Sequence, residues 1–245
     1  MPEIKIQIKN LYKIFGKNPK SALEQVKDGV NKDELLEKHN HVLGLKDINL
    51  DIKEKSIQVV MGLSGSGKST LIRHINRLIE PTDGSVVVDG EDVLKMNDES
   101  LRDFRRKKTA MVFQRFALLP HKTVLENTMF GLHIQNIDEK EANTRARRWI
   151  DRVGLSGYEE KYPQHLSGGM QQRVGLARAL TNDGEILLMD EAFSALDPLI
   201  RKDMQDILLE LQDELHKTVV FITHDLDEAL KIGDPQFLKP HLGHE

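Results

Sequence analysis

The stretch GLSGSGKST at residues 62 to 70 decides the fold of this chain. It fits the spacing G-x-x-x-x-G-K-[ST], in which glycines let the backbone approach a phosphate and successive N–H groups surround it. The apolar, β-branched run SIQVVM (56–61) before it predicts a buried strand. The run TLIRHINRLI (70–79) after it has apolar residues at helical spacing, which predicts a helix that continues up to Pro81. Strand, glycine loop and helix in this order predict a site for the phosphates of a nucleotide.

The residue types in this loop have distinct expected roles. The N–H groups of residues 64 to 69 are expected around the β-phosphate, Lys68 at the β- and γ-phosphate oxygens, and the Ser69 hydroxyl on Mg²⁺. A chance match in an ordinary turn is the alternative, and the flanking strand and helix argue against it. The predicted nucleotide-binding residues of the loop are Gly62, Leu63, Ser64, Gly65, Ser66, Gly67, Lys68, Ser69 and Thr70.

Three polar side chains follow two further apolar runs that read as buried strands. EILLMDE (185–191) ends in Asp190 and Glu191, and KTVVFITH (217–224) ends in His224. In P-loop enzymes an acid at this point holds Mg²⁺, usually through water, which predicts a metal ligand at Asp190. Its neighbour Glu191 is placed to orient and deprotonate an attacking water. His224 is predicted to contact a γ-phosphate, with a packed structural histidine as the alternative.

Composition narrows the classes of protein. The chain has 245 residues, a net charge of −4 and no cysteine. This length suits one domain with an insertion, and the charge gives no reason to expect a nucleic-acid partner. The basic clusters Arg105–Lys108 and Arg145 with Arg147–Arg148 are predicted to be solvated helix faces. No apolar run reaches the roughly 18 residues of a membrane span. The segment MPEIKIQIKN (1–10) is unlike a signal peptide. The lack of cysteine suits a reducing cytoplasm.

Six motifs occur in the order found in an ATPase subunit of ABC transporters. They are GLSGSGKST, Gln114 in MVFQRFALLPH, LSGGMQQR (166–173), ILLMDE, SALD (194–197) and His224. The chain resembles this family over about residues 3 to 234, with Met170 at the fifth position of the LSGGQ-type signature. The resemblance implies hydrolysis of ATP to ADP and phosphate, with ATP and Mg²⁺ as cofactors. It also implies an α/β fold: a P-loop NTPase (RecA-like) core with an antiparallel β region and an inserted α-helical subdomain.

The resemblance implies further site residues. Gln114 is expected to ligate Mg²⁺ together with Ser69 and Asp190, and to act beside Glu191 and His224 in catalysis. Two subunits are expected to pair head to tail, so that each signature motif contacts the γ-phosphate of the partner's ATP. The residues expected at that contact are Ser167, Gly168, Gly169 and Gln171, with Asp197 in the D-loop. Phe15 matches the aromatic position for adenine stacking, with Tyr12 as the alternative; either residue is otherwise a core side chain.

The domain boundaries follow from the same resemblance. Residues 1–113 and 176–234 are expected to form the nucleotide-binding core, with an insert at 16–43, and 114–175 a helical subdomain. That subdomain and Gln114 are expected to receive the cytoplasmic helices of a transmembrane permease. The protein is thus expected at the cytoplasmic face of the membrane, acting indirectly with a substrate-binding protein. Residues 235–245 read as an atypical tail, and the regulatory CBS modules of longer members are expected to be absent.

The insert bears on the transported solute. Together with NRLIEPTDG (76–84) and RRKKTAMVFQRFALLPH (105–121), it resembles the importer group for glycine betaine, proline betaine and related osmoprotectants. Ser21 and Glu24 are predicted to form a capping box that opens a short helix in a solvated hairpin. The alternatives are an importer subunit for another small solute, a soluble ABC ATPase acting on nucleic acid or ribosomes, and a P-loop GTPase or kinase. His241 and His244 are too few to predict a metal site.

Overall fold

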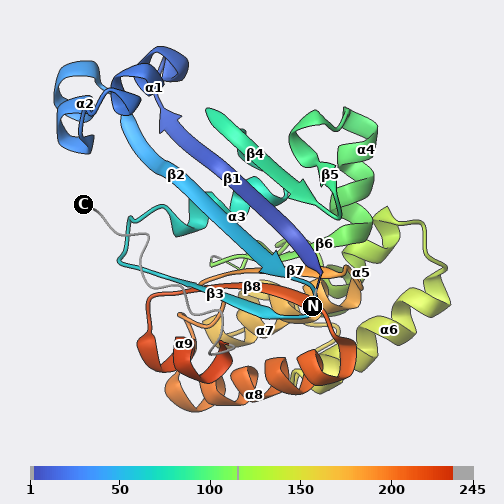
Figure 1. Cartoon of the computed structure of the whole chain (residues 1–245). Helices are drawn as coiled ribbons and strands as arrows, with labels where there is room; N and C mark the ends of the chain where they lie inside the picture. The colour runs from blue at the N-terminus through green and yellow to red at the C-terminus, as the bar shows by residue number, and fades with distance from the viewer. Residues whose placement is uncertain (1–2, 115, 234–245) are drawn as a thin grey trace. The chain divides into compact units, whose positions relative to one another are not determined.

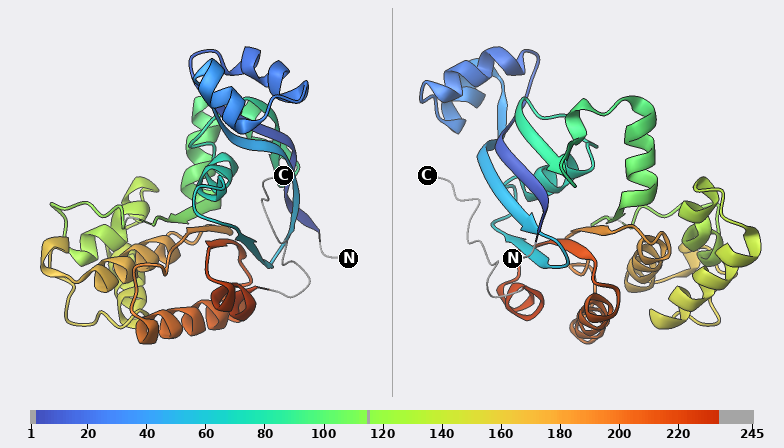
Figure 2. Two further views of the ribbon diagram at one scale, coloured as in Figure 1. Left: turned by 90° about the vertical axis from the view of Figure 1, so that its left-hand side faces the viewer. Right: turned by 45° about the vertical axis from the view of Figure 1, so that its right-hand side comes forward.

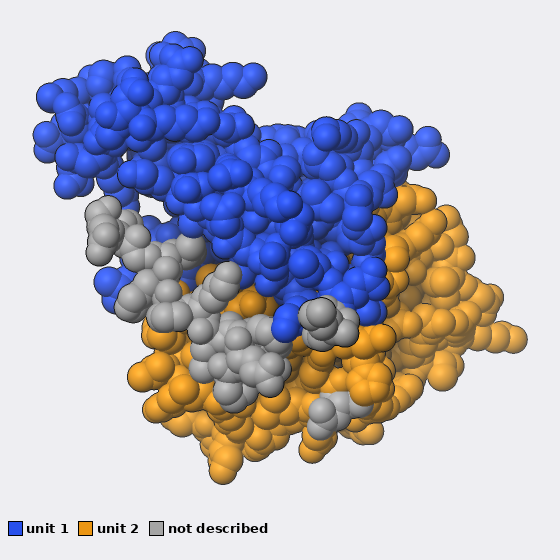
Figure 3. Space-filling model, in the orientation of Figure 1, with its two compact units in different colours: residues 1–54, 62–101, 242–245 blue, residues 55–61, 102–241 orange. Residues whose placement is uncertain are grey.

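A computed structural model describes residues 3–114 and 116–233. The predicted tail at 235–245 and its histidines therefore lie outside the described residues. The chain divides into two compact units (Figure 3). The first contains the described residues up to Glu54 together with Gly62–Leu101, and the second contains Lys55–Met61 and the described residues from Arg102 onward.

An antiparallel sheet forms the body of the first unit, in the strand order β2-β1-β4-β5 (Figure 1). Apolar side chains alternate along its long strands and are buried at Ile6, Ile8, Ile52, Val86 and Val88, as expected for a sheet with one covered face. The helix α3 packs against β2 and β4. The elements of this unit are β1 (Ile4–Phe15), β2 (Val42–Lys53), α3 (Lys68–Ile75), β4 (Asp83–Val88), β5 (Glu91–Asp92), the 3-10 helix η1 (Val93–Lys95) and the start of α4 (Asp98–Asp103).

The helix α3 is shorter than the prediction up to Pro81. It ends at Ile75, and Arg77 has a left-handed backbone with φ of 52°. The Arg77 guanidinium donates hydrogen bonds to the carbonyls of Val93 at 3.2 Å and Met96 at 2.7 Å. These distant partners turn the chain away from the helix, although the apolar spacing itself continues.

The insert between β1 and β2 forms two helices, α1 (Pro19–Lys27) and α2 (Lys32–His39), beyond the paired ends of these strands (Figure 2). The predicted capping box at Ser21 is wrong, because α1 begins at Pro19 and Ser21 lies inside the helix. Proline suits the first turn of a helix, since its φ is already helical and no N–H is lost there. The insert is also more than a solvated hairpin: Leu23, Val26 and Leu35 form a small buried core with other apolar side chains of this unit.

A parallel sheet with the strand order β3-β8-β7-β6 forms the centre of the second unit. Its strands are β3 (Ile57–Met61), β6 (Thr109–Val112), β7 (Ile186–Asp190) and β8 (Thr218–Thr223), which confirms the strands predicted before the glycine loop, Glu191 and His224. Every residue of β7 and β8 is buried, so these strands are continuous apolar runs rather than alternating ones. Because the strands are parallel, their carboxyl ends lie at one edge of the sheet.

Helices complete the second unit. The helix α5 packs against α6 and α7, while α7 also packs on β6, and α9 on β3 and β8. The helical elements are the π-helix η2 (Phe104–Lys108), α5 (Val124–Ile134), α6 (Glu139–Arg152), the 3-10 helix η3 (Pro163–His165), α7 (Gly168–Thr181), α8 (Pro198–Leu215) and α9 (Leu226–Ile232). Among the described residues, none of these helices is long and apolar enough to cross a membrane.

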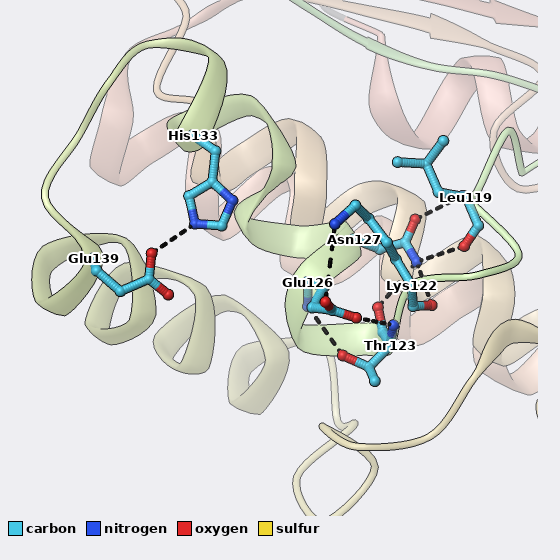
Figure 4. A network of polar contacts seen from close by, with 7 residues as sticks. All are labelled: Leu119, Lys122, Thr123, Glu126, Asn127, His133 and Glu139. Carbon is cyan, nitrogen blue, oxygen red and sulfur yellow. Dashed lines mark hydrogen bonds and ion pairs between the residues drawn. The ribbon is translucent and has the colours of Figure 1, made fainter.

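A polar network fixes the start of α5 (Figure 4). Thr123 and Glu126 form a capping box, in which each side chain accepts a hydrogen bond from the other residue's backbone N–H. The Asn127 amide joins the preceding loop to the helix by bonding both the N–H and the carbonyl of Leu119. At the far end of α5, His133 lies 3.0 Å from Glu139 at the start of α6.

Candidate functional site

The glycine loop follows β3 directly along the chain and leads into α3. The Lys68 ammonium donates hydrogen bonds to the carbonyls of Gly62 at 2.7 Å and Leu63 at 2.8 Å. Its side chain is buried, with 4% of its surface exposed. These bonds hold the lysine ammonium against the carbonyls that begin the loop.

Two features of the loop fit a bound phosphate. The Ser66 hydroxyl oxygen is buried and has no hydrogen-bond partner among the described residues. Gly67, the N-cap of α3, has φ of +89°, and a Cβ atom there would lie 2.3 Å from the carbonyl oxygen of Gly44. Only glycine meets both the positive φ and this close approach. The first N–H groups of α3 thus follow a sharp turn, which is a suitable setting for an anion.

Phe15 lies beside the same Gly44. A Cβ atom at Gly44 would be 2.8 Å from the Phe15 ring, which is 40% exposed. The Lys13 ammonium lies 4.9 Å from the ring centre, within cation–π range. Tyr12, the alternative aromatic residue, packs instead against the insert's core, where burial raises its pKa. Within the first unit, Phe15 is thus the aromatic residue that shares a glycine neighbour with the phosphate loop.

In the second unit, three predicted site residues meet after the parallel strands. The Gln114 amide donates a hydrogen bond to Glu191 Oε2 at 2.9 Å. His224 Nδ1 lies 3.4 Å from the same oxygen. Asp190 at the end of β7 is fully buried, whereas the His224 side chain is 55% exposed. One carboxylate oxygen of Glu191 thus lies next to both of its expected catalytic neighbours.

The backbone of Glu191 is held on both sides. Its φ of +48° is left-handed, a conformation that costs a residue other than glycine on the order of 1–3 kcal/mol. Its N–H donates to the carbonyl of Ile222 at 3.1 Å, and its own carbonyl accepts from the Ser194 N–H at 3.2 Å and hydroxyl at 2.9 Å. These three bonds maintain the turn that directs the carboxylate away from the strand.

The signature motif opens α7. Ser167 is the N-cap, and its hydroxyl accepts from the Met170 N–H at 3.3 Å. Ser167 and Gly168 are exposed, so this helix N-terminus and its partial positive charge face solvent. The Gln171 amide donates to the carbonyl of Leu166 at 3.2 Å and so stabilises the bend before the helix. Gly169 packs near Leu196, a residue of the SALD segment, with ordinary contact distance for a Cβ atom.

The segment that carries Gln114 is bonded to the same helix. The Gln172 amide donates to the carbonyl of Phe113 at 3.4 Å, and the Arg178 guanidinium donates to that of Ala117 at 2.6 Å. Burial lowers the pKa of Arg178. Backbone carbonyls on either side of Gln114 are therefore held by side chains of α7.

Sequence reasoning did not single out several residues that shape this site. Ser194 was visible in the SALD motif, but its bonds to Glu191 depend on the turn. Asp197 was predicted, and the structure places it as the N-cap of α8, accepting from the Ile200 N–H at 3.1 Å. Arg201 in the first turn of α8 and Asp225 at the N-cap of α9 form an ion pair at 3.2 Å. Nothing in their local sequence indicates this pairing.

The sequence of the chain is similar to proteins of one known family. The family model described as ABC transporter matches residues 45–194. The chain is 57% identical over 231 residues to the glycine betaine transport ATP-binding protein OpuAA of Bacillus subtilis, covering 94% of this chain and 55% of that protein. It is 58% identical to the glycine betaine/proline betaine transport system ATP-binding protein ProV of Escherichia coli, covering 94% and 58%. The chain thus spans little more than half the length of these curated relatives.

Solved structures give the same result. The dimeric ATP-binding cassette MJ0796 in a post-hydrolysis state with ADP and phosphate superposes with a TM-score of 0.79 and 34% identity, covering 92% of this chain and 90% of that one. The predicted fold class, a P-loop α/β core with an antiparallel β region and an inserted helical subdomain, is thereby confirmed. From the family match, the high identity to its relatives and this fold, we conclude that the chain belongs to the ABC transporter family.

Proposed function

We propose that this chain is the subunit of an ABC importer that binds and hydrolyses ATP. The observation that carries the proposal is the set of residues after the parallel strands: Gln114 after β6, Asp190 and Glu191 at the end of β7, and His224 after β8. The glycine loop follows β3 of the same sheet along the chain. A phosphate cradle and a general base at the strand ends are what transfer of a phosphoryl group to water requires.

The roles of the residues follow from their chemistry. Lys68 and the loop N–H groups bind the β- and γ-phosphates, and Phe15 stacks on the base. Ser69, Asp190 and Gln114 would hold Mg²⁺ through oxygen atoms, the ligand type that this ion prefers, and the ion would neutralise charge on the phosphates. Glu191 accepts a proton as the water oxygen bonds to the γ-phosphorus and the bond to the ADP oxygen breaks. His224 contacts the γ-phosphate.

We propose that two subunits pair head to tail, with the signature of one on the ATP of the other. Support comes from the exposed N-terminus of α7, where Ser167 and Gly168 face solvent. The relative MJ0796 is described as dimeric. A ligand shared between the two copies explains why one chain carries two glycine-rich anion sites, at 62–70 and at 167–169.

A permease is the proposed partner of the helical subdomain at 114–175. A cavity of about 370 Å³ in the second unit is lined in part by Phe113 and Ala117, which precede and follow Gln114 in the sequence. Its wall includes Phe113, Phe130 and Ile134, with Arg105, Arg106 and Arg178 among the charged residues that line it. This mixture of apolar and basic side chains fits a short amphipathic helix that carries acidic residues. The chain would then act at the cytoplasmic face of the membrane and serve a substrate-binding protein indirectly.

Glycine betaine or a related osmoprotectant is the proposed solute. The relatives OpuAA and ProV, which are named for glycine betaine, are 57% and 58% identical, against 48% for a trimethylamine N-oxide transport protein of Pelagibacter ubique and 46% for a methionine import protein of Staphylococcus haemolyticus. Another small solute is the alternative. The test is uptake of labelled glycine betaine, trimethylamine N-oxide and methionine by cells in which this chain replaces the ATPase subunit of the matching transporter. Uptake of methionine alone would contradict the proposed solute.

ATP hydrolysis is tested separately from transport. We expect the purified chain to release phosphate from ATP in the presence of Mg²⁺, and excess GTP to compete poorly. Absence of Mg²⁺-dependent phosphate release, with and without a permease, would contradict the proposed function. Equal competition by GTP would contradict the assignment of ATP as the nucleotide.

A further inference from the structure

We propose that Arg201 is a positioning residue for hydrolysis, which holds His224 in place relative to Glu191. The inference rests on the proposed ATPase function and goes beyond it, because Arg201 lies in no motif of the nucleotide site. Arg201 is in the first turn of α8, four residues after the N-cap Asp197. Its guanidinium lies between two loops that start at the ends of different strands.

Two hydrogen bonds define the bridge. Nη2 donates to the carbonyl of Leu196 at 3.1 Å, and Nη1 donates to Asp225 Oδ2 at 3.2 Å. The third nitrogen, Nε, is buried and has no hydrogen-bond partner among the described residues. The guanidinium is planar, so these two bonds from separate nitrogens fix its orientation as well as its position.

The first loop connects the bridge to the general base. Leu196 N–H bonds the carbonyl of Phe193 at 3.1 Å, and Ser194 bonds the carbonyl of Glu191 through both its N–H and its hydroxyl. The segment from Glu191 to Leu196 is therefore held by short-range hydrogen bonds along its length. A shift of the Leu196 carbonyl is expected to move the turn that directs the Glu191 carboxylate.

The second loop connects the bridge to the histidine. Asp225 directly follows His224, and its N–H donates to the Thr223 hydroxyl at 3.0 Å. Asp225 Oδ1 accepts from the Glu228 N–H at 3.2 Å as the N-cap of α9. The buried Glu228 carboxylate in turn accepts from the Thr223 hydroxyl and the Gln205 amide. His224 is thus flanked by fixed neighbours, and Arg201 ties this assembly to Leu196.

The partial exposure of the Arg201–Asp225 pair indicates that it positions other groups rather than stabilising the fold. The side chains of Arg201 and Asp225 are 28% and 36% exposed, so water can solvate either group if the other is removed. Ion pairs at such sites contribute little to stability. The distance that the bridge controls, between His224 Nδ1 and Glu191 Oε2, is 3.4 Å. Small misplacements of catalytic groups reduce rates strongly, by up to about 100-fold for roughly 1 Å.

The test compares Arg201→Gln, Arg201→Lys and Asp225→Asn in the full chain, with Lys202→Gln as the matched control. Lys202 is the neighbouring exposed residue and loses one positive charge in the same way. We measure kcat and KM for ATP, binding of a fluorescent ATP analogue, and thermal unfolding. We expect Arg201→Gln to lower kcat about 10- to 100-fold with nucleotide affinity and melting temperature near the parent values. Arg201→Lys should fall in between, because an ammonium cannot span both partners as a planar fork does.

A double variant sharpens the result. If the bridge acts as one unit, Arg201→Gln combined with Asp225→Asn should reduce kcat little further than Arg201→Gln alone. Parent-like kcat in Arg201→Gln, or a kcat loss that only follows a lower melting temperature in all three variants, would overturn the inference. An inactive parent would overturn the proposed function and this inference with it, whereas an active parent with an equally active Arg201→Gln overturns the inference alone.

Discussion

Gly67 approaches Gly44 so closely that the two residues leave no room for a side chain between the phosphate loop and β2. A Cβ atom at Gly67 would lie 2.3 Å from the carbonyl oxygen of Gly44, while one at Gly65 would meet nothing within 4 Å. Gly67 and Gly65 both have a positive φ, of +89° and +78° respectively. A comparison of variants at these two positions therefore separates the effect of backbone conformation from that of close packing.

We expect Gly65→Ala to reduce the free energy of unfolding by about 1–2 kcal/mol, the cost of a left-handed alanine. Gly67→Ala should reduce it by clearly more, because the new methyl group also displaces β2 or the loop. Denaturant titration of both variants measures the difference. Equal losses would show that the contact with Gly44 relaxes freely.

Glu191→Gln keeps the size of the side chain and its hydrogen bonding but removes the base. Hydrolysis should fall by about 10²- to 10⁴-fold, the usual contribution of a positioned general base. ATP should bind at least as well, since a negative charge near the γ-phosphate is lost. Unhydrolysed ATP shared by two subunits should then hold them together, because a ligand that binds the assembly stabilises it by mass action. Phosphate release and size-exclusion chromatography with ATP and Mg²⁺ measure the two effects, and hydrolysis at the parent rate would remove Glu191 from the mechanism.

Ser167→Arg and Lys68→Ala test the shared site by complementation. Each variant alone should lack hydrolysis, because both sites of its dimer carry the lesion. Lys68→Ala should also lose measurable ATP binding, whereas Ser167→Arg should retain it in the monomer. Mixed dimers should regain one intact site, since both lesions then fall on the other one. Differently tagged subunits, purified together and assayed for phosphate release, give the answer. Mixed dimers as inactive as the two single variants would contradict the head-to-tail arrangement.

Glu126 should make the stability of α5 depend on pH. The Thr123 N–H donates to its carboxylate and lowers its pKa. Because the pKa of Glu126 is lower in the folded state, its stabilisation is complete above the pKa of the unfolded chain, which is about 4.3. The stabilisation is lost as the pH falls through the pKa of the folded state. Glu126→Gln keeps an acceptor for this bond but does not titrate. The stability difference between parent and variant should therefore shrink or reverse below about pH 4, as measured by unfolding at several pH values. A difference that is constant across this range would show that the capping box does not depend on the charge.

The strands β7 and β8 and the polar residues after them were predictable because each strand is a short apolar run that ends in polar residues. That pattern survives in the structure, where every residue of both strands is buried. The length of α3 was not predictable, because Arg77 bonds carbonyls 16 and 19 residues away. The start of α1 was missed because Ser21 and Glu24 match a capping box, while Pro19 two residues earlier already fits a first turn.

In the candidate site, the individual residues were predictable from the sequence, whereas the contacts between them were not. Gln114, Glu191 and His224 each belong to a recognisable motif, so the sequence indicated them individually. Their meeting at one carboxylate oxygen depends on the strand order, which no local pattern contains. Arg201 and Asp225 are 24 residues apart, and their pairing depends on how α8 and α9 leave the sheet.

The helices α1 and α2 leave and re-enter the antiparallel sheet at adjacent points, because Phe15 pairs with Val42 across β1 and β2. Such an insert can be changed with little effect on the sheet, because its two ends lie on paired residues of neighbouring strands and most of its small core consists of side chains of the insert itself. We expect a peptide tag or a labelled residue inserted after Gly29, with the glycine kept because its φ is +103°, to leave the sheet's register unchanged. The insert thus offers a reporter position in the same compact unit as Phe15, from which occupancy of the base site can be followed by fluorescence.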